Sequence, residues 1–84
     1  MAYSITFLRR AQKELDRLPK REGARILDAI RLLAEMPRPA GSRRLRDREG
    51  RRIRVGAYRV IYSVDDTQRK VVILEVGHRR DVYR

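Results

Sequence analysis

Arg52 and Arg54 alternate with Ile53 and Val55 in a short strand-like segment, and Arg59 follows in the next one. Side chains along a β-strand point alternately to its two faces, so burial of the two apolar residues would place both arginines on the opposite face. Guanidinium groups bind phosphate oxygens through paired hydrogen bonds. We therefore expect Arg52, Arg54 and Arg59 to form an exposed cluster suited to binding phosphate. The alternative is the solvated face of an antiparallel sheet that is covered only on its other side.

The last residues of the chain, HRRDVYR, add groups that arginine cannot replace. Histidine can transfer a proton near neutral pH, whereas arginine cannot, and tyrosine can stack on a base. With the strand arginines, His78, Arg79, Arg80 and Tyr83 could cleave RNA. That chemistry removes a proton from a ribose 2′ oxygen, stabilises charge on phosphorus and protonates the departing 5′ oxygen. The alternatives are a structural role for His78 at the end of a strand and an ion pair between Asp81 and an arginine.

A strand and two helices are expected at the start of the chain. Residues 2–7, AYSITF, have the aromatic and β-branched composition of a strand. Apolar residues then recur at spacings of three and four in 8–18 and in 20–36, which predicts two amphipathic helices. Pro19 separates the helices, which should form a hairpin, and Pro37 is expected to end the second one.

The second half of the chain reads as a basic connection followed by three strands. Residues 38–50 are rich in Pro, Gly and charge, which favours an irregular connection. Strands are predicted at 51–55, 57–64 and 70–76, where short turns should make an antiparallel meander. The tyrosines and valines of the middle strand are expected to pack on the helices, and Gly77 to end the last strand. The order of elements predicts an α+β fold, βααβββ, with a helical hairpin on a small, largely antiparallel sheet.

Composition limits the classes of function. We expect 84 residues to form one domain, 1–84. The net charge of +11 favours an anionic partner such as nucleic acid, an anionic membrane or an acidic protein. The absence of cysteine and the single histidine argue against a metal site or a cofactor, and no apolar segment is long enough to span a membrane. We therefore expect a cytoplasmic protein.

The whole chain resembles the RelE branch of the RelE/ParE toxin superfamily. The resemblance rests on the helical hairpin ending in LLAEMPRP, on RRIRVGAYRVIY and on the terminal VGHRRDVYR. It implies a fold like that of microbial ribonucleases. It also implies a toxin of a type II toxin–antitoxin system, a metal-independent endoribonuclease that cleaves messenger RNA in the ribosomal A site. The implied partners are messenger RNA, the ribosome and a cognate antitoxin that holds the toxin inactive, with no membrane partner.

The resemblance also suggests a role for individual residues. The family's basic pair falls on Arg52 and Arg54, and the arginine of its Gly-x-Tyr-Arg motif falls on Arg59. The best known member has lysines at the first pair, one of them proposed as the general base, so His78 becomes the natural proton carrier here. The expected catalytic residues are thus Arg54, Arg59, His78, Arg79 and Tyr83, and the expected RNA or phosphate contacts are Arg44, Arg46, Arg51, Arg52 and Arg80.

Two alternatives belong to other classes of function. The ParE branch is similar in fold but poisons DNA gyrase, and it generally lacks the terminal arginine and tyrosine. A basic RNA-binding module without catalysis would bind RNA in a salt-sensitive way and leave it uncut.

Overall fold

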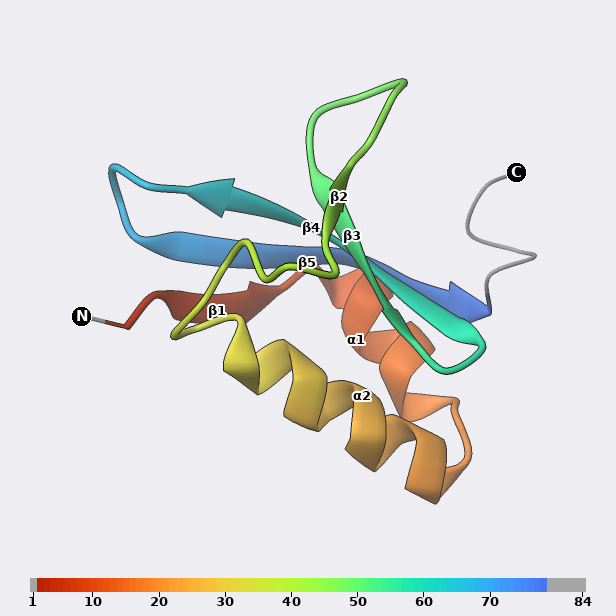
Figure 1. The fold of residues 1–84 in the computed structure, drawn as a ribbon. Helices are drawn as coiled ribbons and strands as arrows, with labels where there is room; N and C mark the ends of the chain where they lie inside the picture. Colours follow the sequence, from red (N-terminus) through yellow and green to blue (C-terminus); the bar gives the residue numbers. More distant parts are fainter. Residues whose placement is uncertain (1, 79–84) are drawn as a thin grey trace.

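The computed structural model describes residues 2–78. Two helices accompany a five-stranded sheet whose strand order is β1-β5-β4-β3-β2 (Figure 1). β1 runs parallel to β5, and the other neighbouring strands are antiparallel. The predicted α+β fold, with a helical hairpin on a mostly antiparallel sheet, is confirmed. The elements are β1 (Ser4–Phe7), α1 (Arg9–Asp16), α2 (Lys20–Leu32), β2 (Arg43–Arg44), β3 (Arg51–Val55), β4 (Tyr58–Asp65) and β5 (Lys70–His78).

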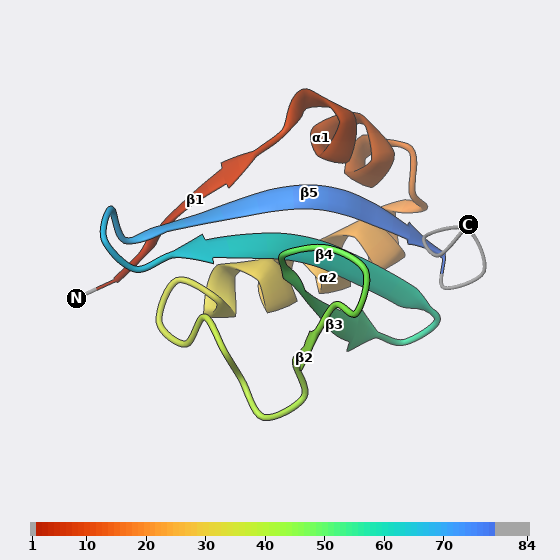
Figure 2. The same ribbon diagram turned by 90° about the horizontal axis from the view of Figure 1, so that it is seen from above.

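Both helices lie on the same side of the sheet, as the amphipathic patterns require (Figure 1). α1 buries Ala11 and Leu15, which are four residues apart and so share one helix face. α2 begins directly after Pro19, whose ring favours a position at the start of a helix. In Figure 2, α2 passes behind β4, whereas α1 lies beyond β5, next to the end of β1. The other face of the β3–β4–β5 meander carries no helix among the described residues.

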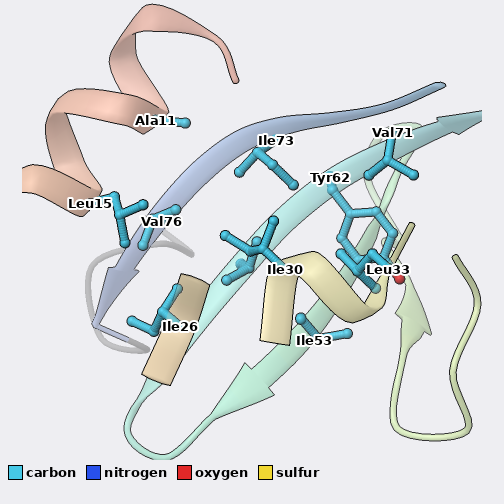
Figure 3. Close-up of a cluster of buried hydrophobic side chains, with 11 residues drawn as sticks. Ala11, Leu15, Ile26, Ile30, Leu33, Ile53, Tyr62, Val71, Ile73 and Val76 are labelled. Carbon is cyan, nitrogen blue, oxygen red and sulfur yellow. The ribbon is translucent and has the colours of Figure 1, made fainter. Parts of the chain in front are cut away.

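The core joins α2 to the middle of the sheet (Figure 3). Ile26, Ile30 and Leu33 pack with the fully buried Val60 and Tyr62 of β4. The expectation that the tyrosine and valine face of the middle strand packs on the helices is therefore confirmed. The buried Tyr62 hydroxyl donates a hydrogen bond to the carbonyl of Pro37 at 2.7 Å. Tyr62, a large aromatic residue, is thus buried with its hydroxyl paired.

α2 ends at Leu32, earlier than the predicted Met36. The amides of Ala34 and Glu35 donate to carbonyls three residues back, at 3.1 Å each, so the last turn is tighter than an α-helix. The carbonyl of Ala34 accepts the amide of Tyr3 at 2.7 Å instead of continuing the helix. The segment before β1 therefore binds a carbonyl just beyond the end of α2 and ties that end to the sheet.

The prediction that Gly77 ends the last strand is wrong. β5 continues through Gly77 to His78, and these residues pair with Arg59 and Tyr58 of β4. Continued pairing satisfies the backbone of β4, which extends to the same point. Glycine weakens a strand but does not break one when its neighbour supplies the ladder of hydrogen bonds.

The basic connection contains a short strand that was not predicted. Arg43 and Arg44 form β2 and pair with Arg52 and Arg51 of β3. The turn between these strands closes through Leu45, whose amide donates to the carbonyl of Gly50 at 3.0 Å. Gly50 has a φ of 122°, which other residues rarely adopt.

We predict that two adjacent leucines at the end of α2 differ sharply in their contribution to stability. Leu33 is 1% exposed and lies in the core, whereas Leu32 is 69% exposed. Leu33→Ala should lower the free energy of unfolding by about 2 to 5 kcal/mol, because it leaves a cavity. Leu32→Ala, the matched control, should change it by less than about 0.5 kcal/mol. Urea denaturation followed by circular dichroism measures both, and equal losses would contradict the described packing.

Candidate functional site

Three arginines lie together on the face of the sheet opposite the helices. Arg54 pairs directly with Arg59 across β3 and β4, and Arg52 lies two residues along β3 from Arg54. Their strand neighbours Ile53 and Val60 pair with each other and point into the core. We call Arg52, Arg54 and Arg59 the arginine face. The arginine alternation predicted from the sequence is therefore what the strand register shows.

The arginine face is less solvated than expected. Arg54 is exposed, but Arg52 and Arg59 are half-buried. Ile61 pairs with Arg52, lies on the same face and is fully buried. Alkyl stems of arginine can cover apolar surface while the guanidinium reaches solvent, which accounts for a buried isoleucine on a face without a helix. The expectation that these three arginines are exposed is therefore confirmed for Arg54 and wrong for Arg52 and Arg59.

A bulge in β5 brings a carboxylate to this face. Tyr62 pairs with Ile73 while Ile61 pairs with Glu75, so Leu74 is an extra residue on β5. The extra residue reverses the alternation, because a bulge shifts every later side chain to the other face. Glu75 therefore lies beside Ile61 instead of entering the core beside Ile73.

Glu75 is held by arginines from two distant segments. The Arg10 guanidinium of α1 donates to Glu75 Oε1 at 2.6 Å. The Arg48 guanidinium, from the turn between β2 and β3, donates to Glu75 Oε2. A nearly buried carboxylate needs such partners, since burial without them is strongly unfavourable. These bonds fix α1 and the 45–50 turn to the same strand.

A second glutamate positions α1 against the edge of β5. Past Ile73, β1 no longer covers that edge, and the amide of Leu8 donates to the Ile73 carbonyl at 2.9 Å. Further along, the Val76 amide donates to Glu14 Oε1 at 2.9 Å. Arg10 also lies 3.4 Å from Glu14, one helical turn away. The side chain of Glu14 thus replaces the missing strand and sets where Arg10 stands.

Two of the expected phosphate contacts lie away from the arginine face. Arg51 shares its strand face with Ile53 and donates to the hydroxyl of the buried Ser42 at 2.9 and 3.1 Å. Arg44 pairs with Arg51 and so belongs to the same side of the sheet. Arg46 is exposed in the turn that follows β2. By register, only Arg52 among the expected phosphate contacts on β2 and β3 belongs to the arginine face.

His78 stands at the end of the sheet but on the helix side. It pairs with Tyr58, whereas Gly77 pairs with Arg59 on the arginine face. The rings of Tyr58 and His78 meet edge to face, with centroids 5.8 Å apart. A shallow pocket of about 390 Å³ begins at His78 and passes around the edge of β5 to Glu75, lined also by Arg10, Glu14, Arg17, Leu18, Tyr58, Val76 and Gly77. The pocket therefore connects His78 with Glu75 and Arg10, and none of the three residues of the arginine face lines it.

Three expected site residues, Arg79, Arg80 and Tyr83, lie outside the described residues, as does Asp81.

The opposite end of the sheet carries a separate polar cluster. Asp66 accepts bonds from the Arg38 guanidinium at 2.9 and 3.1 Å and from the Tyr3 hydroxyl at 2.6 Å. Arg38 first, and then Tyr3, lowers the pKa of the Asp66 carboxyl, and the bond to Asp66 raises the pKa of Tyr3. This cluster ties the N-terminus and the segment after α2 to the β4–β5 turn. Its distance along the strands from Arg54 and Arg59 indicates a structural role.

Sequence reasoning missed Arg10, Arg48 and Glu75. One signal was available, because Glu75 is the single acid within the apolar segment KVVILEV. A lone charge in such a segment requires a buried partner or a break in the alternation, and here both are present. The partners could not be identified from the sequence, since Arg10 is 65 residues away from Glu75 in the chain.

Among residues 2–78, no helix has the length and apolar character needed to cross a membrane.

Comparison with known proteins connects this chain to one superfamily. A family model described as "ParE toxin of type II toxin-antitoxin system, parDE" matches residues 5–83. Toxin RelG of Mycobacterium tuberculosis is 37% identical over 86 aligned residues, covering 100% of this chain and 99% of that one. The family model carries the ParE name and this relative the RelE-type name, so the solved structures help to place the branch.

Two solved structures have the same fold over nearly the whole chain. A toxin–antitoxin complex of M. tuberculosis, RelBE2, matches with a TM-score of 0.83 and 33% identity, covering 94% of this chain and 100% of that one. An archaeal RelE–RelB complex from Pyrococcus horikoshii matches with a TM-score of 0.84 and 30% identity, covering 98% and 100%. The curated relative and both solved structures carry RelE-type names, which places the chain in the RelE-like branch. The chain belongs to the RelE-like branch of the RelE/ParE superfamily and is a toxin of the type II toxin–antitoxin class.

Proposed function

We propose that this toxin is an endoribonuclease that cleaves messenger RNA in the ribosomal A site and so stops translation in the cytoplasm. The observation that carries the proposal is the arginine face, on which Arg52, Arg54 and Arg59 stand in register on two paired strands. Three guanidinium groups on neighbouring positions of two strands are suited to binding the scissile phosphate of an RNA strand and the phosphate next to it. The resemblance to RelE toxins supplies the substrate class.

The proposed reaction is attack of a ribose 2′ oxygen on the adjacent phosphorus, which breaks the bond from phosphorus to the 5′ oxygen of the next nucleotide. The 2′ hydroxyl loses its proton, and the departing 5′ oxygen gains one. Arg54 and Arg59 would stabilise the charge that develops on the phosphate oxygens, and Arg52 would hold a neighbouring phosphate. Because arginine does not exchange protons near neutral pH, His78 is proposed to carry the proton, reaching the RNA at the edge of β5. Arg79 and Tyr83 are proposed to complete the site, by charge stabilisation and by stacking on a base. No metal ion enters the scheme.

We propose that a cognate antitoxin holds this toxin inactive. The solved relatives from M. tuberculosis and P. horikoshii are toxin–antitoxin complexes. The net charge of +11 would attract an acidic or amphipathic antitoxin segment, because charge complementarity speeds association. Expression of the toxin is therefore expected to require coexpression of that partner.

Arg54→Ala should abolish most cleavage of ribosome-bound message. Loss of one group that stabilises transition-state charge typically lowers the rate by roughly 10²-fold or more. Arg31→Ala is the matched control, because it removes the same charge from an exposed position on α2, where Arg31 pairs only with Asp28 among the described residues. Primer extension on purified ribosomes programmed with a defined message measures both variants. Equal activities would remove Arg54 from the site, and wild-type protein that binds message without cutting it would support the RNA-binding alternative.

His78→Gln should lower the same cleavage rate by about 10²-fold or more, the scale of general acid or base catalysis. A second variant separates chemistry from packing, because His78 contacts Tyr58 edge to face. His78→Phe keeps an aromatic ring at that contact but carries no proton. Both variants should be inactive if His78 transfers a proton. Activity close to wild type in His78→Phe would assign His78 a structural role at the end of β5.

A further inference from the structure

Glu75 and its two arginine partners differ greatly in exposure. The Glu75 side chain is 12% exposed, whereas those of Arg10 and Arg48 are 67% and 51% exposed. The carboxylate is thus largely inside, whereas about half or more of each arginine side chain faces solvent, and Arg10 also donates to Glu14 at 3.4 Å. An arginine has five donors, so each of these groups can accept a second anion or exchange one anion for another.

The Glu75 cluster continues the arginine face. Arg52, Ile61 and Glu75 form one row across β3, β4 and β5, directly beside the row of Arg54, Arg59 and Gly77. The bulge at Leu74 is what brings the carboxylate into this row. A carboxylate held by guanidinium groups from two segments has the same hydrogen-bonding pattern as a phosphate group held by them. The Glu75 carboxylate lies one row along from Arg54 and Arg59. An RNA strand with one phosphate at Arg54 and Arg59 would bring its next phosphate to this position, beside Arg10 and Arg48.

We propose that Arg10 and Arg48 form a further phosphate subsite for RNA, and that the Glu75 carboxylate occupies this subsite when no RNA is bound. An RNA phosphate then competes with Glu75 for the two guanidinium groups. The Glu75 carboxylate thereby lowers the affinity of the toxin for free RNA. Messenger RNA that the ribosome holds in place is then bound in preference to free RNA. This inference rests on the proposed function, in that it takes RNA as the substrate.

Removal of the internal carboxylate tests the competition directly. Glu75→Gln should bind a fluorescent 12-nucleotide 2′-O-methyl RNA about tenfold more tightly at 50 mM KCl, measured by anisotropy. The logarithm of affinity should also fall more steeply with the logarithm of salt, by about 0.7 for each arginine released to a phosphate. Glu22→Gln is the matched control, since it removes the same charge from a pair with Arg25 on α2. The control should leave affinity within about twofold of wild type and show no change in slope.

Arg48 provides the second arm of the experiment. In the wild-type background Arg48→Ala should change affinity by less than about twofold, because Glu75 already holds that guanidinium. In the Glu75→Gln background it should remove most of the gain, a coupling that a double-mutant cycle isolates. Arg48 is exposed on a turn, so this variant is expected to fold even where Glu75→Gln does not. Thermal melts confirm folding for every variant.

Each outcome decides the inference. Tighter binding by Glu75→Gln that depends on Arg48 supports it. Equal affinity of Glu75→Gln and Glu22→Gln, a tenfold loss from Arg48→Ala alone, or no binding by any variant overturns it. The 2′-O-methyl RNA cannot be cleaved, so these results do not depend on catalysis. If the coupling is found but ribosome-bound message is not cut, the subsite stands as an anion site and the proposed function fails.

Discussion

The pairing of β4 with its two neighbours places two kinds of side chain on opposite faces of one sheet. Val60 and Tyr62 must enter the core that α2 covers, and this burial is the main favourable term in folding. Because side chains alternate between faces along a strand, Arg59 must then lie on the face opposite the core. The same alternation on β3 places Arg52 and Arg54 on that face. The arginine face is therefore a consequence of how the core is packed. A slip of one residue in the register would destroy the core and the site together.

The same arrangement has an electrostatic cost. Arg54 and Arg59 pair directly across strands, and like charges at such a position repel. An anion bound between or beside them would relieve that repulsion, and this is the place where the proposed function puts a phosphate group. Glu75 supplies one negative charge to the neighbouring row, and Glu14 fixes the helix that carries Arg10. Both carboxylates thus set the positions of positive groups, at the edge of β5 where the pocket leads to His78.

Most of the architecture followed from periodicity in the sequence. Spacings of three and four predicted both helices, and alternation predicted the three long strands and the arginine face. β2 was missed because two arginines carry no strand signal, and their pairing depends on a turn closed by Leu45 and Gly50. The positions of Glu75 and His78 depend on the bulge at Leu74, which has no local signature in an apolar segment. Strict alternation would have placed Glu75 in the core and His78 on the arginine face.

The roles of Arg79 and Tyr83 stay predictions from the family resemblance, because these residues lie outside the described part of the chain. In the proposed function, the arginine face acts on messenger RNA held by the ribosome. Mapping of 5′ ends across cellular transcripts, minutes after induction of the toxin without its antitoxin, tests this claim most directly. We predict new ends at discrete positions within translated codons, together with rapid loss of protein synthesis. Intact messages, with arrested replication and a DNA damage response, would contradict it and indicate a gyrase poison.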